Sequence, residues 1–228
     1  MTAGDAASTR EQCTHSFRVM RWVAAFALAL IVLSGYEVLA NWNLGRFASG
    51  AAPMVLWTAL DRWLPTVPWL VWPYAFYYVL VMMPVFLARR PSQLAEMIAA
   101  YFLVSVVAWG VFVLFPVRME YPHLACAGIS CRMLEGLYRV DGGVNVMPSL
   151  HAAHSILAAS IFFTYRSRLA WPVLAAALAV CVAAVLTRQH YLVDVPPGVV
   201  LGLVGWVVVR WVGGAARRLW RPTPVTSP

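Results

Sequence analysis

Long uncharged stretches alternate with short polar segments along most of the chain. Val67–Ala88, Met97–Phe115 and Leu169–Thr187 contain no charged residue at all. At 1.5 Å per residue, about 20 apolar residues are enough for a helix to cross a hydrocarbon core of about 30 Å. The pattern therefore predicts several membrane-spanning helices.

Extending this reading to the whole chain predicts an all-α, polytopic membrane protein. We expect six spans: Trp22 to about Ala40, Val67–Ala88, Met97–Phe115, Ser149–Tyr165, Leu169–Thr187 and Val195 to about Val212. They form one membrane domain, residues 22–213, between a cytoplasmic segment 1–21 and a flexible cytoplasmic tail 214–228. The first span is longer than a signal-peptide core and lacks a clear cleavage site, so we expect it to be retained.

Two polar regions interrupt the predicted spans. After a polar turn at 41–50, the stretch Pro53–Leu64 is too short to cross and carries two tryptophans, which is typical of an interfacial helix. Residues 116–148 form a long polar loop with turns at Gly142 and Gly143. Loops of this length inside a compact domain usually serve a function.

The composition excludes an ordinary soluble domain, because 62% of the residues are hydrophobic and only 11% are charged. The net charge of +8 comes from 17 arginines and no lysine. These arginines flank apolar segments, so membrane topology explains them better than nucleic-acid binding does. We expect no nucleic-acid partner.

The arginines also predict the orientation. With six spans, eleven lie on the side of the termini and six on the other side. The positive-inside rule then places both termini in the cytoplasm. It places the loop 116–148, His151 and His190 on the outer face. From the size and the all-arginine composition we expect a bacterial inner-membrane protein.

Three residues on that outer face suggest acid–base or nucleophilic chemistry. His190 and Asp194 are four residues apart, so on a helix they share a face and the carboxylate can orient the imidazole. The second imidazole nitrogen then remains free as a nucleophile or base. His151 opens the fourth predicted span and supplies another acid–base group.

A phosphate has expected binding partners beside these histidines. Pro148 and Ser149 are favourable at a helix start, whose free N–H groups bind anions. Arg188 and Arg118 can supply planar donors to phosphate oxygens. His154, one helical turn after His151, is expected to be a packing residue.

Two motifs in the chain resemble those of a known family. Pro148-Ser149-Leu150-His151, followed by His190-x-x-x-Asp194, is similar to the type-2 phosphatidic acid phosphatase superfamily. Leu150, Tyr191, Phe115-Pro116-Val117-Arg118 and Asp61-x-x-x-Pro65-x-x-Pro68 resemble its inositolphosphotransferase-like branch, which includes inositol-phosphorylceramide synthases. The resemblance covers roughly residues 55–205.

The resemblance implies a six-helix membrane fold and a metal-independent reaction of a phospholipid or lipid phosphate, without a cofactor. His190 would attack phosphorus, Asp194 would orient it, and His151 would protonate the leaving oxygen. Ser149, Arg188 and Arg118 would hold the phosphate. The chain also departs from the superfamily, since Ala184 stands where the phosphatases carry an arginine and their lysine motif is missing.

Several alternatives remain open at this stage. The acceptor is either water, for a hydrolase, or a lipid hydroxyl, for a transferase of phospholipid or sphingolipid metabolism. Other functions are a small transporter or flippase-like carrier and a catalytically inactive structural relative. The uncharged spans argue against transport. Cys126 and Cys131 form either a disulfide or two free thiols, and the sequence does not predict an oligomeric state.

Overall fold

The computed structural model describes residues 3–219, with side chains for residues 16–215, and is all-helical over that range. Met54 and Val117 form an isolated bridge, but no strand is present in the described range. The helices are α1 (Ala3–Ala48), α2 (Ala59–Trp63), α3 (Val71–Met82), α4 (Pro91–Leu114), α5 (Ile129–Asp141), α6 (Leu150–Thr164), α7 (Ala170–Leu186) and α8 (Val195–Leu219). Three 3-10 turns, η1 (Pro68–Leu70), η2 (Met83–Leu87) and η3 (Leu192–Asp194), extend them.

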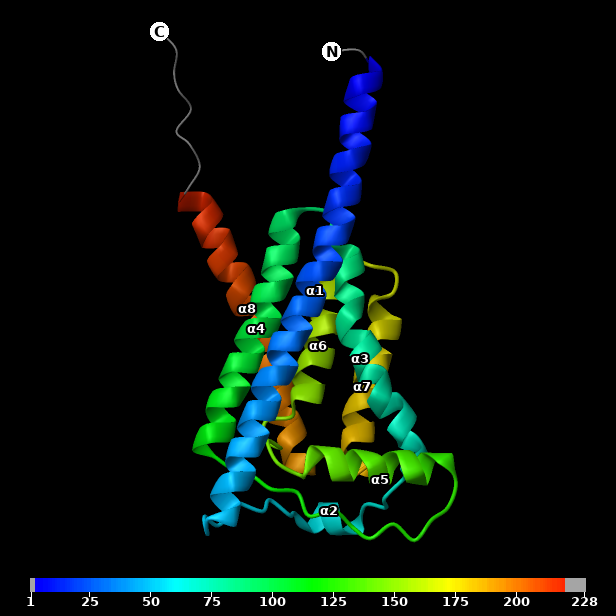
Figure 1. The fold of residues 1–228 in the computed structure, drawn as a ribbon, viewed down its shortest axis with the longest axis vertical. Coiled ribbons are helices and arrows are strands. Elements are labelled where there is room, and N and C mark those ends of the chain that lie inside the picture. The colour runs from blue at the N-terminus through cyan, green and yellow to red at the C-terminus, as the bar shows by residue number, and fades with distance from the viewer. Residues whose placement is uncertain (1–2, 220–228) are drawn as a thin grey trace.

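The long helices run side by side, and α6 lies within the bundle (Figure 1). It packs against α3, α4, α7 and α8, so most of its side chains are buried. α1 begins and α8 ends at one end of the bundle, whereas α2 and α5 lie at the other end (Figure 1). The connections at that second end carry the candidate site.

Small residues allow α6 and α8 to approach closely. A Cβ atom on Gly198 would lie 2.4 Å from the carbonyl oxygen of Ser149, and one on Gly202 would lie 2.2 Å from that of Ala153. Such contacts are typical of membrane helices, whose association depends on close backbone packing. Because α6 carries His151 and α8 follows the second motif, this interface fixes the two motifs relative to each other.

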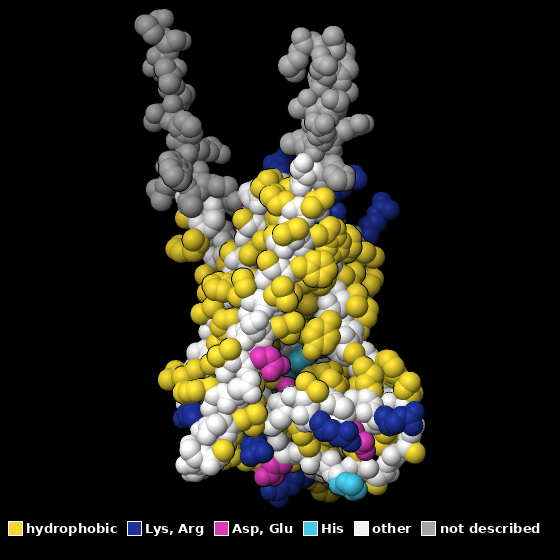
Figure 2. Space-filling view, in the orientation of Figure 1, with side chains coloured by type: hydrophobic (Ala, Val, Ile, Leu, Met, Phe, Trp, Pro, Cys, Tyr) yellow, Lys and Arg dark blue, Asp and Glu magenta, His cyan; other side chains and the backbone are white. Residues whose placement is uncertain are grey.

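Among the described residues, four helical segments are long and apolar enough to cross a membrane: Ser16–Ala48, Pro68–Leu87, Pro91–Leu114 and Leu192–Ala215. The apolar helices α6 and α7 are shorter, with 15 and 17 residues. Hydrophobic side chains cover the middle of the molecule, and charged side chains gather near α5 (Figure 2). The prediction of a helical membrane protein is therefore confirmed, while the count of six spans stays a prediction.

The structure also changes some predicted boundaries. α1 continues to Ala48, so most of the expected turn at 41–50 is helical. The expected interfacial helix is reduced to α2, with five residues. The loop 116–148 contains the amphipathic helix α5, which the sequence analysis did not predict. Its apolar face packs on the bundle, so that its last residues reach the candidate site.

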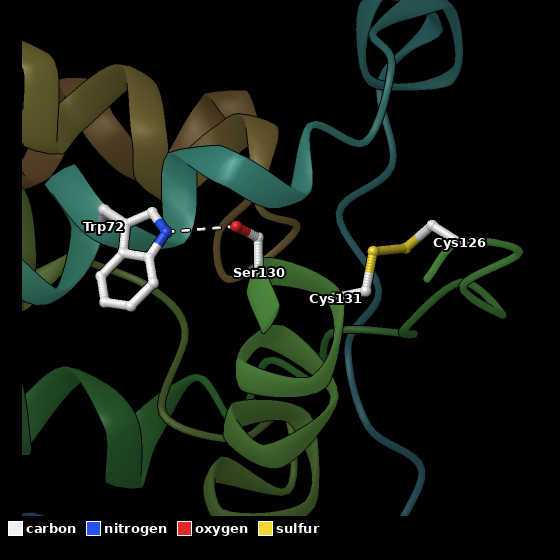
Figure 3. Close-up of a disulfide and its surroundings, with 4 residues drawn as sticks. All are labelled: Trp72, Cys126, Ser130 and Cys131. Atoms are coloured by element: carbon white, nitrogen blue, oxygen red, sulfur yellow. Dashed lines mark hydrogen bonds between the residues drawn. A yellow bond between two sulfur atoms is a disulfide. The ribbon is translucent and has the colours of Figure 1, made fainter. Parts of the chain in front are cut away.

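Both ends of α5 are tied down. A disulfide joins Cys126 to Cys131 at its start, and the indole N–H of Trp72 in α3 donates to the Ser130 hydroxyl at 3.1 Å (Figure 3). At its end, Gly142 has φ 65°, in the left-handed region that glycine adopts readily. The chain then turns toward α6 and delivers Asn145 and Val146 to the site.

Candidate active site

His190 lies in the turn between α7 and η3, where it is buried. The backbone N–H groups of Gln189 and His190 both donate to the carbonyl of Ala184, which holds this turn against the end of α7. The Nδ1 atom of His190 lies 2.8 Å from the carbonyl oxygen of Val146. A carbonyl can only accept, so Nδ1 carries the proton and Nε2 keeps a free lone pair. Burial lowers the pKa of His190 to about 4.

Asp194 reaches this histidine differently from the expectation. The two residues do not share an α-helical face, because His190 precedes η3 and Asp194 ends it. Oδ2 of Asp194 lies 3.9 Å from Nδ1 of His190 and accepts a hydrogen bond from the Tyr191 backbone N–H at 2.7 Å. Asp194 therefore holds the turn that carries His190, and Val146 is the direct hydrogen-bond partner of the imidazole.

His151 lies in the first turn of α6 and faces His190. Its Nδ1 is 3.4 Å from Nε2 of His190, so the two motifs meet. The His151 ring packs against the rings of Tyr74 and Tyr77, with centroid distances of 4.4 and 4.3 Å. These contacts fix the ring plane, and they direct Nδ1 at the other histidine.

The histidine pair lies at a cavity of about 130 Å³ between α1, α3, α5 and α6. Acidic and phenolic side chains also lie at this cavity. Asp141 accepts hydrogen bonds from Tyr36 at 2.6 Å and from Tyr121 at 2.7 Å. Burial raises the pKa of Asp141, and the two phenol hydrogen bonds oppose that shift. Glu37 lies at the same cavity and is exposed, and Figure 2 shows acidic and histidine side chains adjacent on this face.

The expected phosphate-binding residues do not line this cavity. Arg188 is turned away, since its guanidinium donates to the backbone carbonyls of Asp61 and Leu64. The exposed Arg118 side chain lies over the Phe47 ring. Ser149 caps α6, accepting a hydrogen bond from the Ala152 N–H at 3.3 Å. The structure thus brings together the histidines and Asp194, and leaves both arginines outside.

His154 has partners on both ring nitrogens. Nδ1 lies 2.7 Å from the Tyr77 hydroxyl, and Nε2 lies 3.1 Å from the Ser105 hydroxyl. These contacts join α6 to α3 and α4, as expected of a packing residue. Within the described part of the chain, no three His, Cys, Asp or Glu side chains come close enough to hold a metal ion.

Several residues at the site were missed by the sequence reasoning. Gln189 and Asp141 line the cavity. Asp61, named above only as part of a motif, accepts the Leu192 N–H at 2.8 Å and so supports the turn between His190 and Asp194. Gln189 carried no signal beyond its place before His190. Asp141 carried such a signal, because it precedes the two turn glycines of the long loop 116–148.

A second, apolar cavity adjoins the first. It has a volume of about 320 Å³ and lies between α1, α3 and α4. The two cavities share a wall along α1 and α3, since both are lined by Val32, Leu33, Tyr77 and Tyr78. The larger of these two cavities lies at the hydrophobic middle of the molecule, and its lining is apolar.

Comparison with known families decides the relationship. A family model described as the PAP2 superfamily matches residues 53–208, which include both histidine motifs. The chain belongs to the PAP2 superfamily. Comparison with curated proteins and with solved structures gave no match. PAP2 proteins are generally phosphatases or phosphotransferases, so the chain is a membrane protein of that enzyme class.

Proposed function

We propose that this PAP2 protein cleaves a P–O bond of a lipid phosphate or lipid phosphodiester through a covalent phosphate on His190. The proposal rests on the contact of Nε2 of His190 with Nδ1 of His151. This contact lies at a cavity that shares a wall with an apolar cavity. The Val146 carbonyl leaves the Nε2 lone pair free, and the depressed pKa keeps the imidazole neutral at physiological pH.

The reaction has two steps that use the same two side chains. In the first, Nε2 of His190 bonds to phosphorus and the P–O bond to the leaving group breaks. His151, which takes up a proton beside the bound phosphate anion, gives that proton to the leaving oxygen. In the second, an incoming hydroxyl attacks phosphorus and gives its proton to His151, and the N–P bond breaks. Both histidines then return to their starting states.

The substrate separates the two rings when it binds. A phosphoryl group does not fit between nitrogens 3.4 Å apart, so the leaving oxygen takes the place of the direct His151–His190 contact. Asp194 and Val146 keep His190 in place during this movement. The apolar cavity accepts one hydrocarbon chain of the lipid while its phosphate lies at the histidines.

We further propose six spans, with α6 and α7 as the short fourth and fifth crossings. The histidine end then faces outward and the arginine-rich termini face the cytoplasm. The acceptor is water or a lipid hydroxyl, and the features shared with the inositolphosphotransferase-like branch favour the latter. Because the second step is chemically the same, the residue roles are unchanged between the two acceptors.

Purified protein in vesicles with phosphatidic acid or phosphatidylinositol, radiolabelled at phosphorus, tests the proposal. We expect a protein-bound label that is stable to base and labile to acid, as N–P bonds are. His190→Ala abolishes this label, whereas His151→Ala slows its formation and turnover. Label on His190→Ala protein, or none on the wild type, contradicts the proposal. Adding diacylglycerol or ceramide distinguishes transfer from hydrolysis.

A further inference from the structure

Gln189 is a buried polar side chain without a complete set of partners. It is 2% exposed, and its Nε2 has no hydrogen-bond partner. Its Oε1 lies 3.5 Å from the Tyr121 hydroxyl, which donates at 2.7 Å to Asp141. A buried amide N–H without a hydrogen-bond partner is destabilising. Such a group is explained if a ligand supplies the missing acceptor.

The same side chain lines the cavity that contains both histidines. Its position follows from the turn after α7, where Arg188 has φ 56°. The chain reverses there, so that Arg188 reaches the carbonyls beside α2 while Gln189 lies at the cavity. Arg188 was the expected phosphate ligand, and its neighbour occupies the position that such a ligand needs.

The proposed reaction requires a donor at this place. Negative charge spreads over the non-bridging phosphoryl oxygens in the transition state. No arginine lines the cavity in the described part of the chain. A fixed amide dipole in a site of low dielectric stabilises such charge, and it does so without reorganisation.

Resting on the proposed function, we infer that the Gln189 amide donates from Nε2 to a non-bridging oxygen of the phosphoryl group on its way to His190. Gln189 thereby supplies a donor to a cavity that no arginine lines in the described residues. A neutral donor binds the anion less tightly in the ground state than an arginine does. Loss of the Gln189 amide should therefore lower kcat strongly and raise KM only slightly.

Gln189→Leu tests this assignment, since leucine fills a similar volume without the amide. We expect the rate of His190 phosphorylation to fall by about 100-fold, as for loss of one oxyanion donor. The thermal midpoint should stay unchanged or rise, because an unsatisfied buried group has been removed. Gln189→Glu should be slower still and should bind vanadate at least 10-fold more weakly. Gln93→Leu is the matched control, because Gln93 only caps α4.

The outcomes separate this inference from the proposed function. Wild-type protein that forms no phosphohistidine overturns both. Rapid phosphorylation of Gln189→Leu protein, with label on His190 as usual, overturns the role of Gln189 alone. A slow Gln189→Leu variant with a lowered thermal midpoint, matched by Tyr121→Phe in both measurements, assigns Gln189 to support of Tyr121 and overturns the inference as well.

Discussion

The Nε2 atom of His190 lies 3.4 Å from Nδ1 of His151, although 39 residues separate the two histidines. Two further contacts define their roles. The Val146 carbonyl fixes the tautomer of His190, and Tyr74 and Tyr77 hold the ring of His151. The pair is thus assembled by the bundle, and each of its members depends on a different element.

The rate of His190 phosphorylation should begin to fall only at an unusually low pH. Burial lowers the pKa of His190 to about 4, so the neutral nucleophile persists as the pH falls and is lost only when the pH passes that value. The neutral form of an unperturbed histidine would be lost near its ordinary pKa of about 6.5. Single-turnover phosphorylation, measured between pH of about 4 and about 8, should stay on its plateau to about pH 5. A midpoint near the ordinary value contradicts this prediction.

Arg188→Ala should reduce stability rather than substrate affinity. The guanidinium ties the carbonyls of Asp61 and Leu64 to the end of α7. Hydrogen bonds to charged groups contribute about 1.5–3 kcal/mol, so we expect the free energy of unfolding to fall by roughly that amount. Thermal unfolding in detergent measures it. A normal midpoint with a 10-fold higher KM would instead identify Arg188 as a phosphate ligand.

Gly202→Ala should weaken the packing of α8 on α6. The new methyl group would lie 2.2 Å from the Ala153 carbonyl oxygen, so the helices must separate. Overpacking of this kind costs about 1–3 kcal/mol. Gly110→Ala in α4 is the control, since nothing lies within 4 Å of its Cβ position. Equal thermal midpoints for the two variants would exclude the close α6–α8 contact.

Cys126 and Cys131 should be oxidised in protein taken from cells. The structure joins them by a disulfide at the start of α5, and the proposed orientation exposes that loop to the oxidising side of the membrane. Mass spectrometry after alkylation without reductant should therefore find neither cysteine labelled. Labelling of both would place the loop, and the histidine end with it, on the reducing side.

The sequence analysis anticipated which histidines meet better than it anticipated the contacts that hold them. The spacing of the two motifs and the count of arginines placed His151 and His190 on one face, where the structure brings them together. Arg188 does not line the cavity, because its direction is set by a left-handed turn that spacing does not reveal. Gln189 was missed for the same reason, as an ordinary glutamine that only the fold brings to the cavity.

The fold was predictable where apolar length alone decides it. The four long spans follow from uninterrupted hydrophobic runs. The ends of α1 were not predictable, because polar residues near Ala48 remain helical through packing on α4. The amphipathic helix α5 was missed, since its apolar face is stabilised by packing on the bundle.

The shared wall of the two cavities has a consequence for kinetics. A lipid that reaches the histidines between α1 and α3 arrives by diffusion in the plane of the bilayer, and its phosphate never crosses bulk water. The quantity that sets the rate is then the number of substrate molecules per unit of membrane area. Diluting the substrate with inert lipid should slow the reaction in proportion, whereas diluting the vesicles with buffer should leave the rate per protein unchanged.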